Sequence, residues 1–215
     1  MSVRIDTVVL GPLMTNGYVL DSEGVCWVVD PGPWPEPLVE LLRRRGFRPE
    51  CLLLTHGHGD HIAGLGALKA AWPDARIVCP AADANMLSDP AANLSADFAL
   101  PLTAPPPDRL VESGQTLLCG ESRWQVLDTS GHTPGGVSYY CPEASAVLTG
   151  DALFDGSIGR TDLPGADFDR LIGNLRRNLL PLPDETRVLP GHGPESTIGR
   201  ERRTNPFLTG RASEF

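Results

Sequence analysis

The chain has 215 residues, of which 41% are hydrophobic and 21% charged, a balance typical of a globular protein and not of a disordered one. The formal net charge of −9 argues against nucleic acid as a partner, since proteins that bind its backbone usually present a basic face. No apolar run reaches the ~18 residues that a transmembrane helix needs, and the first residues lack a signal peptide's apolar region, so we expect no membrane contact.

The cysteines indicate a reducing compartment. They are odd in number, scattered and without a C-x-x-C pair, so we expect reduced thiols that fill the core of a cytoplasmic protein. The length suits one core, and no stretch has the composition of an inter-domain linker, so we expect a single domain over residues 1–215. The cysteines are Cys26, Cys51, Cys79, Cys119 and Cys141.

Strands and helices alternate along the whole chain. In the first half, strands are expected over VRIDTVVL, GYVLD, VCWVVD, CLLLT and RIVCP, and helices over PEPLVELLRRR, IAGLGALKAAW and AADANML. In the second half, strands are expected over DRLV, QTLLC, SRWQVLDT, GVSYYC, SAVLTGD and TRVLPG, and helices over DFDRLIGNLRRNLLPL and ESTIGRERR. Residues 88–107 show no period and are expected to form a long loop, a lid or a substrate wall. The alternation predicts an α/β protein with helix-covered sheets.

Three of the five histidines fall within six residues, in LLLTHGHGDHIAG. The glycines of HGHGD disfavour a helix, so this stretch is expected to be a loop that leaves the strand before it. Side chains alternate in an extended stretch, so His56 and His58 can project to the same side. Asp60 and His61 fall at the start of the next helix, where either can face the same cavity. Imidazole and carboxylate together are ligands for zinc, iron or manganese.

The other two histidines follow the same rule of placement. His132 in LDTSGHTPGG and His192 in VLPGHGP each come after an apolar strand and a turn of small residues. Asp151 does the same in AVLTGD, as His56 does after LLLT. Four strands therefore deliver a ligand-type residue just past their carboxyl ends, where open α/β sheets commonly place their sites.

This ordered set of motifs resembles the metallo-β-lactamase fold superfamily. HGHGDH matches the superfamily motif H-x-H-x-D-H, and SGHTPG, TGD and PGHG extend the resemblance over nearly the whole chain. The resemblance implies an αββα sandwich with a two-metal site along one edge. It implies a first metal on His56, His58 and His132, a second on Asp60, His61 and His192, and Asp151 as the bridge between them.

Two divalent metal ions are therefore the expected cofactor, with zinc first and iron or manganese as the alternatives. A bound metal lowers the pKa of water to about 7, and paired metals can also polarise a substrate carbonyl, so no protein nucleophile is needed. Asp60 and Asp151 are the carboxylates expected to take part in this chemistry. Asp30, in VVDPG, matches a superfamily aspartate that lies near the ligands, so it either supports a ligand histidine or serves as a turn residue before Pro31.

Two further stretches resemble the short, single-domain branch of glyoxalase II-like hydrolases: ALFDGSIGRTDLPGAD and PGHGPESTIGRERRTNPFL. The resemblance implies hydrolysis of a small-molecule thioester such as S-lactoylglutathione. The basic-x-Tyr glutathione contact of the larger enzymes corresponds to Arg160, Thr161 and Asp162, so the base is present and the tyrosine is not. Arg160 is expected either to contact an anionic part of the substrate or to form a surface ion pair.

Other activities share the same ligand set. GRTD also resembles persulfide dioxygenases, in which the equivalents of His56, His132 and Asp151 would hold a single iron. A lactonase is a third enzyme option, and a metal-storing domain is the non-enzyme alternative, which the complete ligand set disfavours. The sequence leaves the oligomeric state open. We therefore predict a metal-dependent hydrolase that cleaves a thioester.

Overall fold

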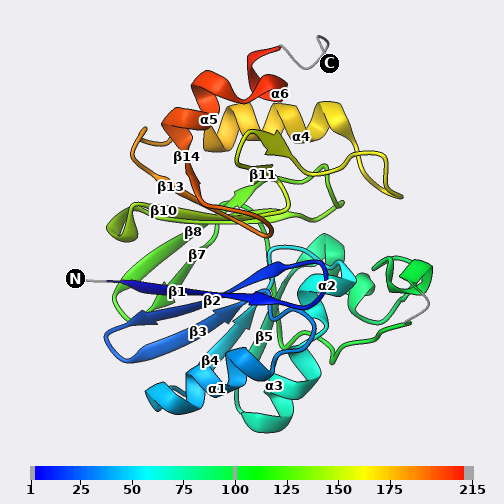
Figure 1. The fold of residues 1–215 in the computed structure, drawn as a ribbon, viewed down its shortest axis with the longest axis vertical. Helices are drawn as coiled ribbons and strands as arrows, with labels where there is room; N and C mark the ends of the chain where they lie inside the picture. Colours follow the sequence, from blue (N-terminus) through cyan, green and yellow to red (C-terminus); the bar gives the residue numbers. More distant parts are fainter. Residues whose placement is uncertain (1–2, 99–100, 211–215) are drawn as a thin grey trace.

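Two six-stranded β-sheets pack face to face, with helices on both outer faces, in a computed structural model that describes residues 3–98 and 101–210. Figure 1 shows α1 and α3 against the outer face of one sheet and α4 and α5 against the outer face of the other. This arrangement is the αββα sandwich that the resemblance implied.

The first sheet is built from the first half of the chain and has the order β1-β2-β3-β4-β5-β6. The pairs β1/β2 and β2/β3 are antiparallel, and the pairs from β3 to β6 are parallel. Parallel neighbours place their carboxyl ends at one edge of the sheet. The strands are β1 (Arg4–Leu10), β2 (Thr15–Ser22), β3 (Val25–Val29), β4 (Pro49–Leu53), β5 (Arg76–Pro80) and β6 (Arg109–Val111).

The second sheet has the order β14-β13-β10-β9-β8-β7, with β10 and β13 parallel and the other pairs antiparallel. A short hairpin, β11 and β12, follows β10 and was not predicted from the sequence. The strands are β7 (Thr116–Cys119), β8 (Ser122–Asp128), β9 (Val137–Cys141), β10 (Ala146–Gly150), β11 (Leu153–Phe154), β12 (Ser157–Ile158), β13 (Arg187–Pro190) and β14 (Ser196–Thr197).

The helices are shorter than the sequence predicted in three places. The helix expected over ESTIGRERR begins only at Ile198, because Ser196 and Thr197 pair as strand β14 with β13. The helix expected over IAGLGALKAAW begins only at Leu65, and Ile62 ends a separate short helix before it, because the Gly64 N–H leaves the helical ladder and donates to the Pro31 carbonyl (2.7 Å). The helix expected over DFDRLIGNLRRNLLPL changes to a π-helical turn after Asn174. The helices are α1 (Glu36–Arg45), α2 (Gly59–Ile62), α3 (Leu65–Ala71), α4 (Phe168–Asn174), α5 (Ile198–Thr204) and α6 (Pro206–Thr209); the remaining turns are η1 (Ala81–Leu87), η2 (Ser95–Phe98), η3 (Pro142–Ala144) and η4 (Leu175–Leu179).

The long loop expected over residues 88–107 is present, with η2 within it, and its residues 99–100 lie outside the described residues. Within the described part of the chain, no helix is long and apolar enough to cross a membrane. All five cysteines are free and buried, as predicted.

Uninterrupted apolar strands are explained by burial on both faces. In β4 and just after it, Cys51 and Leu53 pack between the sheets, whereas Leu52 and Leu54 pack beneath the helices. Side chains alternate between the two faces of a strand, so a strand covered on both sides must be apolar at every position. This burial on both faces fixes the position of each central strand within the sandwich. The residues that follow its carboxyl end therefore lie at one defined edge.

Large aromatic side chains fill the space between the two sheets. Trp124 and Tyr139 are both 0% exposed, and the Tyr139 hydroxyl donates to the Leu54 carbonyl of the opposite sheet (2.7 Å). Trp124 Nε1 donates to Ser122 Oγ (3.1 Å), so its one polar atom is satisfied inside the core.

We expect Trp124→Ala to lower the free energy of unfolding by about 3–5 kcal/mol, because it empties a large space between the sheets. Trp34 is 65% exposed, so Trp34→Ala is the matched control and should change the same quantity by no more than about 0.5 kcal/mol. Urea unfolding of the metal-free proteins measures both. Equal losses for the two variants would contradict this assignment of the core.

Candidate metal centre

Residues from four strand ends meet at one edge of the sandwich. His56 follows β4, His132 follows β8, Asp151 follows β10 and His192 follows β13, as the sequence predicted. The strand β4 belongs to one sheet and the other three to the second sheet, so the cluster spans the gap between them. The short helix α2 adds Asp60 and His61 from its first turn.

The first group of ligand atoms comes from His56, His58 and His132, which lie within 4.8 Å of one another. The backbone at His58 is extended, with φ −66° and ψ 149°, before α2 begins at Gly59. An extended stretch from His56 to His58 turns both rings to one side, so the predicted alternation is present. All three rings are buried.

The second group comes from Asp60, His61 and His192. His192 Nε2 lies 3.1 Å from Asp60 Oδ2 and 3.3 Å from His61 Nε2. The Asp60 carboxylate also accepts a hydrogen bond from the Thr15 hydroxyl at 3.2 Å. Three ligand-type atoms therefore converge on one point, as a metal site requires.

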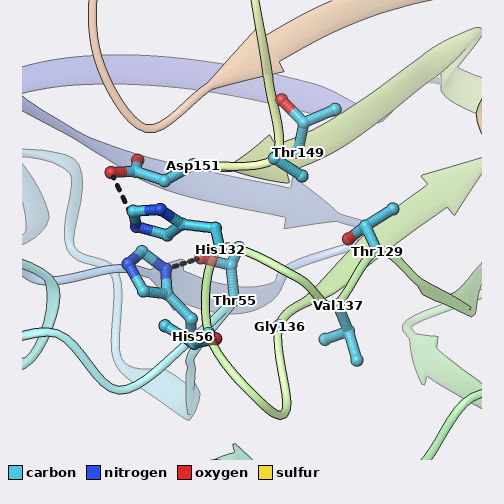
Figure 2. Close-up of a pocket in the computed structure, with 10 residues that line it drawn as sticks. Thr55, His56, Thr129, His132, Gly136, Val137, Thr149 and Asp151 are labelled. Atoms are coloured by element: carbon cyan, nitrogen blue, oxygen red, sulfur yellow. Dashed lines mark hydrogen bonds and ion pairs between the residues drawn. The ribbon is translucent and has the colours of Figure 1, made fainter. Parts of the chain in front are cut away.

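Asp151 lies between the two groups. Its carboxylate oxygens are 3.3 Å from His61 Nε2, 3.5 Å from His192 Nε2 and 3.6 Å from His132 Nε2. Figure 2 shows His56 and His132 side by side, with Asp151 beyond the His132 ring. This position fits the bridging role that the resemblance implied.

Backbone carbonyls fix the orientation of two ligand rings. His132 Nδ1 lies 2.8 Å from the Arg160 carbonyl oxygen, and His192 Nδ1 lies 2.9 Å from that of Leu13. A carbonyl oxygen can only accept, so Nδ1 carries the proton in each ring. In each ring Nε2 therefore faces the cluster, and Nε2 is the atom that a metal ligand would use once it is deprotonated.

Asp30 supports the remaining rings from beneath. Its Oδ2 lies 3.1 Å from His61 Nδ1 and accepts the Thr55 hydroxyl proton at 2.7 Å. The Thr55 oxygen is in turn 3.0 Å from His56 Nδ1, so it accepts the proton of that nitrogen. Asp30 also has φ 48°, a turn conformation that aspartate tolerates. The two interpretations of Asp30 are thus both compatible with its position.

Two observations fit the cluster to a cation. His56 Nε2 and His132 Nε2 are buried and have no hydrogen-bond partner within the described part of the chain, a costly state for polar nitrogens unless something else binds them. Gly191 is packed so closely that a Cβ there would lie 2.1 Å from Asp151 Oδ1 and 2.7 Å from His61 Cε1. Only glycine leaves room for these ligands to converge.

The local charges divide the histidines into two kinds. Burial, followed by the neighbouring histidines, lowers the pKa of His58 to about 3 and holds that of His56 well below its ordinary range. Burial acts the same way on His61 and His192, but nearby carboxylates outweigh it and raise the pKa of His192 to about 10 and that of His61 well above its ordinary value. His56 and His58 are thus neutral and ready to bind, whereas the raised pKa values of His61 and His192 favour protons in the place that a cation would take.

The Arg160 side chain lies at the surface, paired with an aspartate. It forms a two-pronged ion pair with Asp162 at 2.9 Å, and both side chains are 69% exposed. Its backbone carbonyl, by contrast, touches the His132 ring. The structure therefore contains the surface ion pair that was the alternative reading, and it places Arg160 next to a ligand.

Sequence reasoning missed several residues that hold the site in place. Asn16 Nδ2 donates to the carbonyls of Pro190 and Gly193 (3.0 and 2.9 Å), which ties the start of β2 to the loop of His192. Thr55 was predicted only to end a strand. In the sequence, the one sign of a role for Asn16 and Thr55 is a polar residue at the end of a buried strand, because their hydrogen-bond partners lie far away along the chain.

The comparisons with known proteins agree with this geometry. The family model of the metallo-beta-lactamase superfamily matches residues 10–192, and the chain belongs to that superfamily. Its curated relatives include metallo-hydrolases, and the fold and the His/Asp cluster define this chain as a metallo-hydrolase that uses divalent metal ions.

Three relatives bear on the site. The chain is 35% identical to the hydroxyacylglutathione hydrolase GloC of Haemophilus influenzae over 196 residues, which cover 90% of this chain and 92% of GloC. The crystal structure of the BLEG-1 B3 metallo-beta-lactamase has a TM-score of 0.92 and 39% identity, and the match covers 96% of this chain and all (100%) of that one. TTHA1623 in a di-iron-bound form has a TM-score of 0.83 and 43% identity, over 94% of this chain and 100% of the other.

We expect metal binding to the metal-free protein at pH 7 to release protons, about two of them from His61 and His192, since ligands must be deprotonated. Affinity should rise as pH increases toward 10, because protons then compete less. Zinc titration in weak buffer with a pH indicator measures the release. His192→Ala should release about one proton fewer. Metal binding without proton release would contradict the charge assignment.

Proposed function

We propose that this chain hydrolyses thioesters of the S-lactoylglutathione type with two divalent metal ions, and that zinc is the favoured metal. The observation that carries the proposal is the convergence of the complete ligand set at one edge, with Asp151 between its two halves. The relative GloC, a hydroxyacylglutathione hydrolase matched over most of both chains, supports the substrate class. Residues His56, His58 and His132 would hold one ion, Asp60, His61 and His192 the other, and Asp151 both.

The ions, when bound, would acidify water and polarise the thioester carbonyl. The protein side chains would do the rest. Asp60 is ionised, because His61 and His192 overcome the effect of burial and lower its pKa. Its carboxylate faces the cluster, so it can accept a hydrogen bond from the attacking water and orient it. Among the described residues, the groups of His, Cys, Asp and Glu that could hold a cation contain no cysteine, so no thiol nucleophile belongs to the cluster and direct attack by water is the simplest route.

Recognition of the substrate would fall to the rim of the site. Arg160 is proposed to meet an anionic part of the substrate, such as a glutathione carboxylate. The Arg160–Asp162 pair is exposed, and exposed ion pairs contribute little free energy, so exchanging Asp162 for a substrate carboxylate is easy. The backbone of Arg160 is fixed against His132, so its side chain extends from a point beside the reacting groups.

Hydrolysis of S-lactoylglutathione is the decisive measurement, and it should accompany close to two metal ions per chain in the same preparation. The alternatives are tested in parallel by oxygen uptake with glutathione persulfide and by hydrolysis of a lactone and of a β-lactam. Asp151→Ala should lower the thioester rate by more than about 100-fold and reduce metal content, because even a residue that merely orients a ligand contributes 10- to 100-fold.

The results separate the candidates. Persulfide-dependent oxygen uptake by a protein with one iron per chain, without thioester cleavage, would replace the proposal with a dioxygenase. Preferred cleavage of the lactone or the β-lactam would keep the metal centre and change the substrate. Asp151→Ala with unchanged rate and metal content would remove the bridging assignment.

Arg160→Ala should raise KM for S-lactoylglutathione by about 10- to 150-fold with little change in kcat, since a charged hydrogen bond made equally in ground and transition states contributes to binding alone. The backbone carbonyl that holds His132 is kept in this variant. Steady-state kinetics measures both constants.

Two variants control for charge and for the ion pair. Arg203→Ala removes an arginine whose side chain is 65% exposed and paired with Asp184, and it should leave KM unchanged. Asp162→Asn frees the Arg160 guanidinium and should leave KM equal or lower. An unchanged KM in Arg160→Ala would show that this arginine forms only a surface ion pair and does not contact the substrate.

A further inference from the structure

A buried carboxylate outside the ligand set joins the two loops that supply the first group of histidines. Asp83 lies in η1 and is 0% exposed. Its Oδ2 accepts the Gly57 N–H at 3.1 Å and the Thr133 hydroxyl at 2.7 Å, and its Oδ1 accepts the Gly135 N–H at 2.6 Å. Asp83 therefore has three donors and, within the described chain, no cationic side chain among its hydrogen-bond partners.

These donors come from two separate ligand loops. Gly57 lies between His56 and His58, and Thr133 directly follows His132. The loops are about 75 residues apart along the chain, and beside them the Val137 N–H donates to the Thr55 carbonyl at 2.9 Å. Within the loops themselves, the Asp83 carboxylate holds backbone or side-chain donors next to all three histidines of the first group.

The geometry requires a carboxylate at this position. A carboxylate has two acceptor oxygens, and both are used here, one of them twice. Asparagine has nearly the same shape but one acceptor oxygen, so its amide group would face an N–H of Gly57 or Gly135. A buried donor left facing a donor is unfavourable, and the loops would have to move apart to relieve it.

The chain after η1 supports the same loop. The Gly59 N–H donates to the Asn93 carbonyl at 2.8 Å, and Asn93 Nδ2 donates to the Met86 carbonyl at 2.8 Å. Amides on either side of His58 are therefore both held by one segment, residues 83–93. None of the three groups that donate to Asp83 belongs to Asp60, His61 or His192 of the second group.

We propose that Asp83 is a positioning residue that sets the geometry of the His56, His58 and His132 group, and with it the affinity of that group for a divalent cation. The inference rests on the metal centre proposed above. Asp83 acts through the two loops and touches neither substrate nor cation.

Site-resolved metal binding tests the proposal. His61→Ala leaves only the first group complete, and His58→Ala leaves only the second. Asp83→Asn should weaken zinc binding about 10- to 100-fold in the His61→Ala background and leave it unchanged in the His58→Ala background. Equilibrium dialysis with metal analysis gives the affinities, and the melting temperature of each metal-free protein shows whether it is folded.

Two more variants keep the test decisive. Thr133→Val removes one donor with little change in volume and should weaken the first group in the same direction, less than Asp83→Asn does. Asp89→Asn is the matched control, since Asp89 caps backbone amides in the neighbouring exposed turn and touches neither ligand loop.

Each outcome has one meaning. Equal losses in both backgrounds, or an unchanged affinity in the His61→Ala background, would overturn the role of Asp83 and leave the metal centre standing. Absence of zinc binding in both backgrounds with Asp83 intact would overturn the metal centre and this inference together.

Discussion

Imidazole rings bind a cation together only if their unprotonated nitrogens converge, and polar contacts on the opposite side of the ring hold four of the five histidines, His56, His61, His132 and His192, in that arrangement. The Nδ1 atoms of His132 and His192 donate to backbone carbonyls at 2.8 and 2.9 Å, and His61 Nδ1 faces the Asp30 carboxylate at 3.1 Å. Each acceptor belongs to a different segment of the chain. The cluster therefore exists only when these segments are all in their correct register.

The sandwich supplies that register through a few polar contacts that cross between its sheets. The Tyr18 hydroxyl on β2 donates to the Pro190 carbonyl on β13 at 2.6 Å, and Tyr139 on β9 donates to the Leu54 carbonyl beside β4 at 2.7 Å. Both contacts lie close to strand ends that carry ligands. A shift of one sheet against the other would break these bonds and separate the ligands. The packing of the two sheets therefore also sets the geometry of the site.

The strand ends and the ligand-type residues that follow them were predictable because both signals are local. An apolar run such as LLLT followed by HGHGD predicts a strand, its end and the histidines beyond it within a dozen residues. The helix break at Gly64, the hairpin β11–β12 and the acceptors of Asp83 were not predictable, because each depends on a contact with a distant segment. Arg160 is an intermediate case: the sequence left a substrate contact and a surface ion pair open, and the structure contains the ion pair with Asp162.

Ligand geometry and substrate recognition are built from different atoms of the same loops. Arg160 orients His132 through its backbone carbonyl, which any residue provides, while its side chain extends to the surface. Side chains at such rim positions can therefore change without disturbing the cluster. GloC, named a hydroxyacylglutathione hydrolase, and BLEG-1, named a B3 metallo-beta-lactamase, are similar to this chain at 35% and 39% identity, and their names give two different substrate classes. In the proposed function, rim residues select the substrate, because the cluster does not constrain their side chains.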